Sequence, residues 1–300
     1  MDSELALALE LADLADAVTM PRFRAADLLV ESKADLTPVS EADRAAETAI
    51  RERIAAARPA HAVLGEEYGE GDPRRGPSGP AGAAPAGAAP RWIVDPIDGT
   101  RNYVRGIPVW ATLIALEEDG DVRCGVVSAP ALGRRWWAAR GEGAWAAGIA
   151  TSAGRQVAAG GGATGWRDAA GWDDARPIRV SAISRLEDAQ VFHTGFDRMS
   201  PRDLTAFLAL AGTCARARGF GDFWSHVLVA EGAGEIGLEA NGVSVWDLAA
   251  VSVVVEEAGG RFTDHRGERT VRGGTAVSSN GLLHDQVLSI LAGAPAAAAR

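Results

Sequence analysis

The N-terminal part of the chain begins with apolar residues at helical spacing. Leucines and alanines recur every three to four positions over residues 4–18, which predicts an amphipathic helix. A short strand is expected over 27–32. A second helix is expected to follow Ser40 and to end near Ala57, because Asp43 lies three residues after Ser40 in a pattern close to a capping box.

Short apolar runs then follow one another and predict a meandering sheet. The runs are AVLG (62–65), WIVD (92–95), WATLIALEE (110–118), VRCGVVSAP (122–130) and RRWWAAR (134–140), with EDGD and LGR as hairpin turns. In the C-terminal part, the strand-like segments VFHTG, RARGFG, EIGLE and RFTD alternate with helical patterns over 202–211, 223–231, 246–258 and 282–292. This alternation favours a layered α/β fold.

Two segments rich in glycine and alanine show no periodic pattern. They cover residues 71–90 and about 147–174, and their composition cannot bury enough apolar surface to order them. We expect a flexible surface loop in each. The second loop marks the boundary between two lobes of a single domain over 1–300, the first at about 1–175 and the second at about 176–293.

Composition narrows the class of protein without identifying it. A chain of 300 residues with 47% hydrophobic content can bury a large core. It contains no apolar run long enough for a membrane span, and its N-terminus carries acids where a signal peptide needs basic residues, so we expect a cytoplasmic protein with no membrane partner. The net charge of −10 argues against nucleic-acid binding and is compatible with divalent cations. Cys124 and Cys214 lack CxxC spacing and are expected to be buried as small hydrophobes.

The segment WIVDPIDGTRNY (92–103) carries the most informative chemistry. Two carboxylates, Asp95 and Asp98, follow an apolar strand, and Pro96 is expected to bend the chain there so that both face one point. With the intervening carbonyl of Ile97 they would form a compact set of oxygen ligands for a hard cation such as magnesium. An ordinary pair of Asp-Pro and Asp-Gly turns explains the same residues equally well.

Neighbouring residues extend this picture. Gly99 and Thr100 offer backbone N–H groups at the expected start of a short helix, a suitable position for a phosphate. Glu66, in LGEEYGE, follows another apolar strand, and Asp247, in VSVWDLAA, opens an apolar helix. Each acid alone is explained by a solvated loop or by the favourable field of a helix N-terminus.

Together these segments resemble the inositol monophosphatase-like family, which combines a GEE segment, a WIVDPIDGT segment and a late WD segment followed by a helix, in this order. The segments KADLTPVSEAD (33–43) and SSNGLLH (278–284) extend the resemblance over nearly the whole chain. It implies a layered α-β-α-β-α fold with mixed sheets and a homodimer. It also implies two or three Mg²⁺ ions and hydrolysis of a small phosphate monoester by metal-activated water.

Residue roles follow from the same resemblance. The metal ligands would be Glu66, Asp95, the Ile97 carbonyl, Asp98 and Asp247. The catalytic residues would be Thr100, Asp43 and Glu66, of which Thr100 and Asp43 help to position water or a further metal, and Gly99 and Thr100 would bind phosphate. Lys33 lies in the family's early loop, and its role is left open. The first lobe would thus hold metal and phosphate, while the second would recognise the substrate and complete the metal site.

Substrate choice is expected to depend on the second lobe. In RARGFGDFWSH (216–226), Asp222 replaces a small polar residue of inositol-binding members, and Phe223 and Trp224 add aromatic surface. Glu239 is a further carboxylate near this position, and Asp98 and Asp247 would also contact the substrate. An acidic, aromatic pocket suits a phosphorylated amino alcohol with a cationic ring.

Several segments are similar in wording to the bacterial histidinol-phosphatase branch of the family, among them DLTPVSEADRAAE, SAPALGRRWWAA and GFGDFWSHVLVAEGA. The resemblance therefore predicts hydrolysis of L-histidinol phosphate to L-histidinol and phosphate in histidine biosynthesis. His226 would be a helix-packing residue. The alternatives are an inositol-1-phosphatase, a broad sugar-phosphate phosphatase, or a non-catalytic metal-binding homologue.

Overall fold

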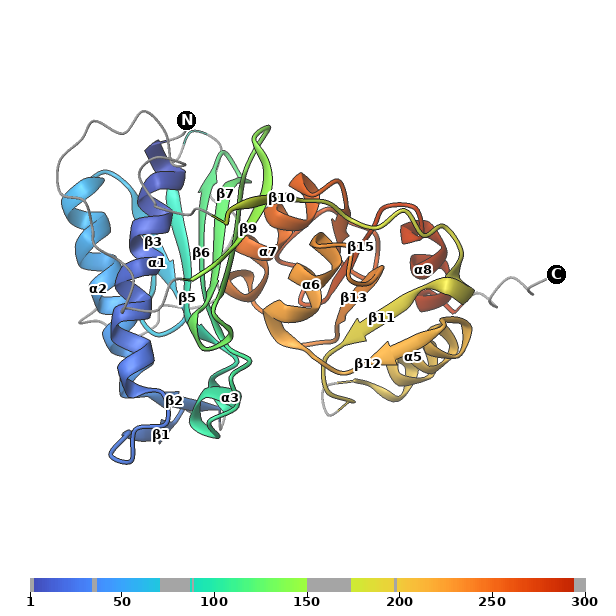
Figure 1. The fold of residues 1–300 in the computed structure, drawn as a ribbon, viewed down its shortest axis with the longest axis horizontal. Coiled ribbons are helices and arrows are strands. Elements are labelled where there is room, and N and C mark those ends of the chain that lie inside the picture. Colours follow the sequence, from blue (N-terminus) through green and yellow to red (C-terminus); the bar gives the residue numbers. More distant parts are fainter. Residues whose placement is uncertain are drawn as a thin grey trace.

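Five layers of secondary structure succeed one another along the long axis of the molecule (Figure 1). The computed structural model describes residues 3–33, 37–70, 87, 89–149, 174–196 and 199–293. Most of the two glycine- and alanine-rich segments, 71–90 and 147–174, lies outside these residues, so their flexibility stays a prediction. The layers follow the order α-β-α-β-α, which confirms the predicted fold class.

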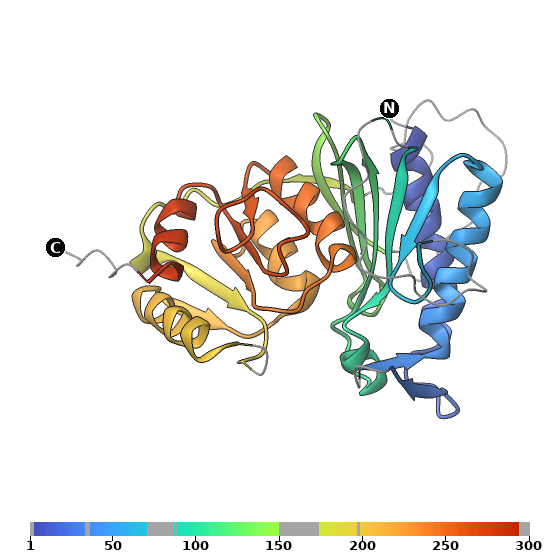
Figure 2. The ribbon, with the colours of Figure 1, turned by 180° about the vertical axis from the view of Figure 1, so that it is seen from behind.

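The outer layer consists of α1 (Ser3–Arg22) and α2 (Glu41–Ala57), which cover one face of the first sheet (Figure 2). A hairpin of β1 (Val30–Ser32) and β2 (Pro38–Ser40) joins them. The predicted capping box is present at the start of α2, where the Ser40 N–H donates to Asp43 at 2.8 Å and the Ser40 hydroxyl accepts from the Ala42 N–H at 3.2 Å. Asp43 is thereby fixed on the first turn of the helix.

The first sheet has eight strands in the order β10-β9-β8-β7-β6-β5-β3-β4. Their bounds are β3 (Ala62–Gly65), β4 (Gly69–Glu70), β5 (Arg91–Asp98), β6 (Ala111–Glu118), β7 (Asp121–Ala129), β8 (Arg134–Ala139), β9 (Gly143–Gly148) and β10 (Arg176–Ile178). The predicted meander from β5 to β8 is confirmed, and β3 pairs parallel to β5. The sequence did not predict β9 because its GAWAAG segment has mostly small residues on both faces.

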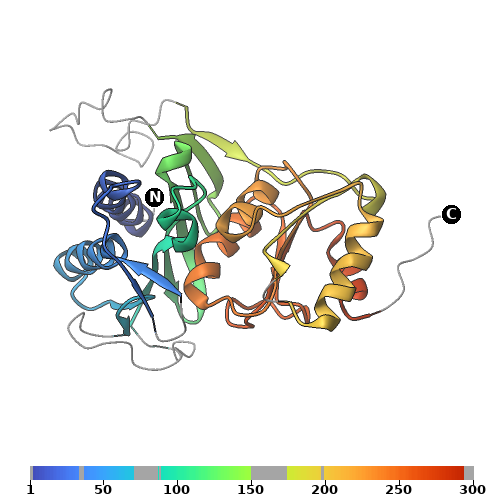
Figure 3. The same cartoon turned by 90° about the horizontal axis from the view of Figure 1, so that it is seen from below.

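The middle layer contains α6 (Asp222–Ala230) and α7 (Val245–Glu257), which separate the two sheets (Figure 3). Buried residues occur all round α7, as expected for a helix packed between two sheets. The helix approaches β7 at Gly125, where a Cβ atom would lie 2.8 Å from Val253 and 2.9 Å from the backbone of Ala250. Only glycine allows this distance between the helix and the sheet.

The second sheet has five strands in the order β12-β11-β13-β15-β14. They are β11 (Gln190–His193), β12 (Arg216–Arg218), β13 (Ile236–Glu239), β14 (Arg261–Thr263) and β15 (Ala276–Ser279). Their pairings are mixed, and β15 was not predicted because AVSS is short and half polar. The outer face is covered by α5 (Pro201–Thr213) and α8 (His284–Leu291). Short helical segments complete the fold: α3 (Thr100–Val104), η1 (Pro130–Leu132) and η2 (Leu186–Asp188).

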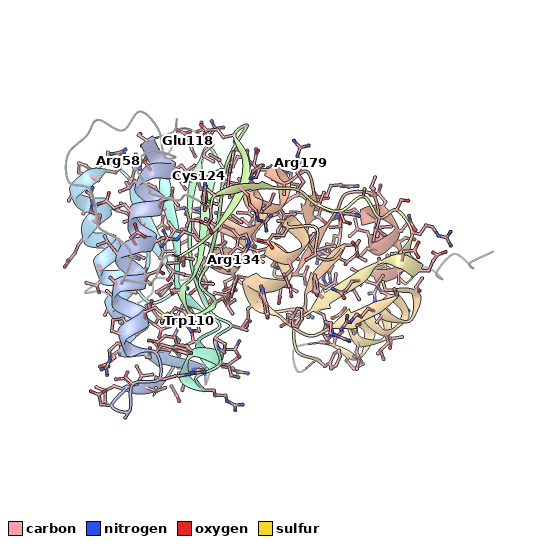
Figure 4. The ribbon with its side chains drawn as sticks, in the orientation of Figure 1. Arg58, Trp110, Glu118, Cys124, Arg134 and Arg179 are labelled. Carbon is pink, nitrogen blue, oxygen red and sulfur yellow. The ribbon has the colours of Figure 1, made fainter. Side chains whose placement is uncertain are left out.

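The expectation that both cysteines are buried is met by one of them. Cys124, labelled in the first sheet in Figure 4, is buried, and Cys214 is partly buried. Among the helices within the described ranges, none has both the length and the apolar character needed to cross a bilayer.

Candidate active site

Strands of both sheets and three helices meet at one cavity of about 620 Å³. The ends of β3, β5 and β13 reach it, as do the first residues of α3, α6 and α7. The predicted site residues that line it are Glu66, Asp95, Ile97, Asp98, Gly99, Thr100, Asp222, Glu239 and Asp247. Residues far apart in sequence therefore share one solvent-accessible hollow.

The path of β5 differs from the expectation for Pro96. The chain does not leave the strand at Pro96, because β5 continues to Asp98 with an irregular register against β6 between Asp95 and Asp98. In a regular strand these two side chains, three residues apart, would point to opposite faces. The irregular register changes this alternation around Pro96, which has no N–H to donate. The next N–H, of Ile97, donates to Asp95 Oδ1 at 3.0 Å.

Three carboxylates form a compact group of oxygen atoms. One oxygen each of Asp95, Asp98 and Asp247 lies within 4.8 Å of the others. Asp247 is held at the start of α7, where its Oδ2 accepts the Ser244 N–H at 2.6 Å. Glu66 lines the same cavity but is not part of this group, and its carboxylate pairs with the ammonium of Lys33 at 2.8 Å.

The three carboxylates carry like charges, and none of them neutralises another. Burial raises the pKa of Asp95 and Asp98 well above the ordinary value, and the neighbouring acids raise it further. Burial also raises the pKa of Asp247 to about 7. A cation would remove this repulsion, and the donors are all oxygen atoms without histidine or cysteine, which fits a hard ion such as Mg²⁺.

Thr100 connects the ligand segment to α2. Its hydroxyl lies 3.3 Å from Asp43 Oδ1 and 3.0 Å from the Ile97 carbonyl oxygen, so it can donate to either. Burial raises the pKa of Asp43 to about 6. Gly99 precedes the five-residue helix α3 with φ +83°, and a Cβ atom there would lie 3.0 Å from the Val109 oxygen, so the turn requires glycine.

The C-terminal half of the chain contributes the remaining acids, from α6 and from the second sheet. Asp222 begins α6 in a left-handed conformation (φ +53°) and accepts a hydrogen bond from Asn102 Nδ2 at 3.1 Å. The following N–H, of Phe223, donates to Asp98 Oδ2 at 2.7 Å. Glu239, at the end of β13, is buried, and its charge contributes to raising the pKa of Asp98. Asp222 and Glu239 thus lie beside the carboxylate group.

The aromatic surface at the cavity differs in part from the prediction: Phe223 is among the lining residues, whereas Trp224 is not and packs against Phe220 at a centroid distance of 4.7 Å. The Phe223 ring is buried and packs against Trp136 at a centroid distance of 6.2 Å. Phe220, three residues earlier, lines the cavity, is 37% exposed and stacks on Phe192. His226 is buried and packs on Phe262 as expected, with Nδ1 2.9 Å from the Ser278 hydroxyl.

Two further residues at the site were not assigned from the sequence. Lys33 forms ion pairs with Glu66 and with Glu67, at 2.8 Å and 2.7 Å. Asn102 holds Asp222, and it follows Thr100 by only two residues, within the WIVDPIDGTRNY segment. A polar residue that close to a ligand segment is a usable signal, whereas its partner lies 120 positions away and is visible only after folding.

The raised pKa values predict how the affinity of the site for a divalent cation depends on pH. Because protons compete for the same oxygens, the half-saturating Mg²⁺ concentration should rise as pH falls below about 7, by up to about tenfold per unit for each competing proton. Titration calorimetry at pH 6, 7 and 8 would measure this. An affinity independent of pH would contradict the assignment of Asp247.

Stability without metal should change in the same window. The pKa of Asp247 is about 7 in the folded chain against an ordinary 3.8, so between these values the folded state binds more protons than the unfolded state. The free energy of unfolding contributed by this group therefore falls as pH rises from about 4 to about 7. Thermal melts in EDTA should show this trend, and the Asp247→Asn variant should show less of it.

Comparison with known proteins gives a consistent result. The model of the inositol monophosphatase family matches residues 1–295. A histidinol-phosphatase of Mycobacterium tuberculosis is 47% identical over 293 residues, which cover 96% of this chain and 97% of that protein. A histidinol-phosphatase of Streptomyces coelicolor is 44% identical, with 96% of each covered. The crystal structure of the extragenic suppressor protein suhB from Bartonella henselae superposes with a TM-score of 0.76 at 26% identity, covering 97% of this chain and 98% of that one.

Proposed function

The chain belongs to the inositol monophosphatase family, and from that premise we propose that it hydrolyses L-histidinol phosphate to L-histidinol and phosphate in histidine biosynthesis, with Mg²⁺ as cofactor. The family is one of phosphatases that depend on metal ions. The observation that carries the proposal is the group of three carboxylate oxygens within 4.8 Å, from Asp95, Asp98 and Asp247, which lies beside two further acids, Asp222 and Glu239.

The proposed ligands are the five that the sequence suggested. Asp95, Asp98 and Asp247 would hold the ions, together with Glu66 and the Ile97 carbonyl, and two or three ions would be accommodated. When bound, magnesium supplies a lowered pKa for the attacking water and positive charge for the phosphate and its leaving oxygen. A non-catalytic homologue would have no need to keep three carboxylates, two of them buried, together against their mutual repulsion.

The chain's own groups would orient the reactants. The Thr100 hydroxyl, within 3.3 Å of Asp43, can accept a hydrogen bond from water while it donates to a carboxylate or carbonyl. Backbone N–H groups of Gly99 and Thr100 would bind phosphate oxygens. These contacts fix the direction of attack, because in-line displacement needs the water opposite the leaving oxygen.

Residues of the second lobe would select the alcohol. Asp222 and Glu239 place two further carboxylates at the cavity, and these would bind the substrate ammonium by charge-assisted hydrogen bonds. Asp98 and Asp247 would contact the same substrate. Phe220 offers a partly exposed ring for the imidazole. The relatives that are 47% and 44% identical are named histidinol-phosphatases, which supports this substrate.

A direct comparison of substrates tests the proposal. At equal concentrations and saturating Mg²⁺, we expect kcat/KM for L-histidinol phosphate to exceed that for myo-inositol 1-phosphate by at least about tenfold, the factor that corresponds to one charge-assisted contact. Phosphate release should stop in EDTA. A preference for the inositol ester would favour an inositol-1-phosphatase, and equal rates on many esters would favour a broad sugar-phosphate phosphatase.

The proposal also covers the localisation, the oligomeric state and the binding partner of the enzyme. We propose a cytoplasmic homodimer with two lobes, about 1–175 for metal and phosphate and about 176–293 for the substrate. Its partner is the small phosphorylated amino alcohol, without nucleic acid or membrane. The net charge of −10 supports the exclusion of nucleic acid.

A further inference from the structure

An acid and a base form a buried pair on α2, one turn beyond Asp43. The Glu47 carboxylate is fully buried and the Arg51 side chain is 6% exposed, with Arg51 Nε donating to Glu47 Oε1 at 2.7 Å. Asp43, Glu47 and Arg51 are spaced four residues apart and therefore share one face of the helix. None of the proposed catalytic steps uses Glu47 or Arg51.

Both members of the pair contact the turn that follows β3. The N–H groups of Glu67 and Tyr68 donate to the Glu47 carboxylate, at 2.8 Å and 3.3 Å. The Arg51 guanidinium donates to the Gly69 carbonyl oxygen, at the other end of the same turn. The turn begins with Glu66, so two backbone N–H groups directly after this proposed ligand are held by a single carboxylate.

Gly65, the residue before Glu66, shows how closely the Glu47 carboxylate approaches the turn. A Cβ atom at Gly65 would overlap the Glu47 carboxylate, so no other side chain fits there without displacing it. On its other side, the Glu66 backbone is anchored to β5, since its N–H donates to the Val94 carbonyl oxygen at 3.1 Å. The backbone of Glu66 is thus fixed from the sheet and from α2.

We propose that Glu47, braced by Arg51, is a positioning residue that sets the affinity of the site for magnesium by holding the Glu66 turn. This inference rests on the proposed function, because it concerns the ion that Glu66 would help to bind. A carboxylate suits the task better than an amide, since it accepts from two N–H groups and a guanidinium at once. Groups that orient a metal ligand through hydrogen bonds, without contacting the metal, typically contribute about 10- to 100-fold to metal affinity or activity.

The variant Glu47→Gln tests this inference. Titration calorimetry with Mg²⁺ on the substrate-free protein should give a Kd at least about tenfold weaker than for the wild-type protein. Amide exchange of residues 66–69 should become faster, and kcat at saturating Mg²⁺ should return to near the wild-type value. That split between metal affinity and kcat would not result from a merely stabilising role.

A second acid–base pair on the same face of the sheet, with a fully buried arginine and an acid that is 13% exposed, supplies a control. Asp16 of α1 accepts from Arg135 Nη2 at 2.6 Å, and Arg135 lies on β8, four strands away from β3. At about 4.8 Å per strand this is roughly 19 Å from the Glu66 turn. Asp16→Asn should therefore lower the melting temperature without changing the Kd for Mg²⁺ or the exchange of residues 66–69.

The outcomes separate the inference from the function on which it rests. If Glu47→Gln binds Mg²⁺ as tightly as the wild-type protein and its turn exchanges as slowly, the inference is wrong. If the wild-type protein itself binds no Mg²⁺, the proposed function fails first. Should Glu47→Gln not fold, Arg51→Lys keeps the charge pair and removes the forked donor to Gly69, and it must show a weaker Kd and faster exchange, or the inference is overturned.

Discussion

Phosphatase turnover should fall by at least about a hundredfold when either Asp95 or Asp98 is replaced by asparagine, a loss typical for a group that stabilises transition-state charge. Asparagine keeps the shape of the side chain and removes a negative charge from the group of three oxygens. The decrease should persist at high Mg²⁺, because the remaining ligands would bind the ion in an altered position. Steady-state kinetics with L-histidinol phosphate over a range of Mg²⁺ concentrations would measure it.

The same variants should leave the fold intact. Burial and mutual repulsion raise the pKa of both carboxyl groups, so without metal the wild-type charges oppose folding. We expect the melting temperature of Asp95→Asn and Asp98→Asn in EDTA to equal or exceed that of the wild-type protein. Asp264→Asn is a suitable control, since this buried acid accepts the N–H groups of Arg266 and Glu268 in a turn outside the cavity. Near wild-type turnover in either ligand variant would refute the metal assignment.

For Asp222→Asn we expect kcat/KM for L-histidinol phosphate to fall by about tenfold or more, because a charge-assisted hydrogen bond contributes roughly 1.5–3 kcal/mol. Asparagine tolerates the left-handed backbone at this position, and its side-chain oxygen can still accept from Asn102. Threonine would match inositol-binding relatives more closely, but a β-branched residue at φ +53° would add backbone strain.

A phosphate ester of an uncharged alcohol identifies the cause of that loss. Hydrolysis of glycerol 2-phosphate by Asp222→Asn should change far less, since its phosphate would meet the same ions. Assays need saturating Mg²⁺, because Asp222 also contributes to raising the pKa of Asp98 and could alter metal affinity. Equal losses on both esters would mean that Asp222 supports the metal site and does not recognise the ammonium. Glu239→Gln, compared in parallel, would show whether the second acid shares the task.

The elements that the sequence predicted correctly are those whose pattern is local. The capping box at Ser40, the apolar strands of the meander and the helix with Asp247 in its first turn each depend on neighbours within a few residues. The ligands Asp95 and Asp98 could be proposed together for the same reason, since both lie in one eight-residue strand. Local patterns of this kind remain visible without knowledge of the fold.

What the sequence did not predict depends on contacts between distant segments. The irregular register that brings Asp95 and Asp98 together exists only where β5 meets β6, and Pro96 alone indicated a bend. Glu47 belongs to the buried face of α2, and its role emerges only beside Gly65. One signal was available: an acid and an arginine four residues apart on a buried stripe need partners, and such partners lie outside the helix.

The carboxylates of the site come from opposite halves of the chain, and this distribution has a kinetic consequence. Asp98 and Asp247 approach each other only when α7 is docked between the sheets, so the site is a contact of high sequence separation, which we expect to form late in folding. A ligand that binds only the completed structure stabilises the native state without stabilising the transition state that precedes it. Magnesium would therefore slow unfolding and protect the chain kinetically, while the refolding rate would stay the same.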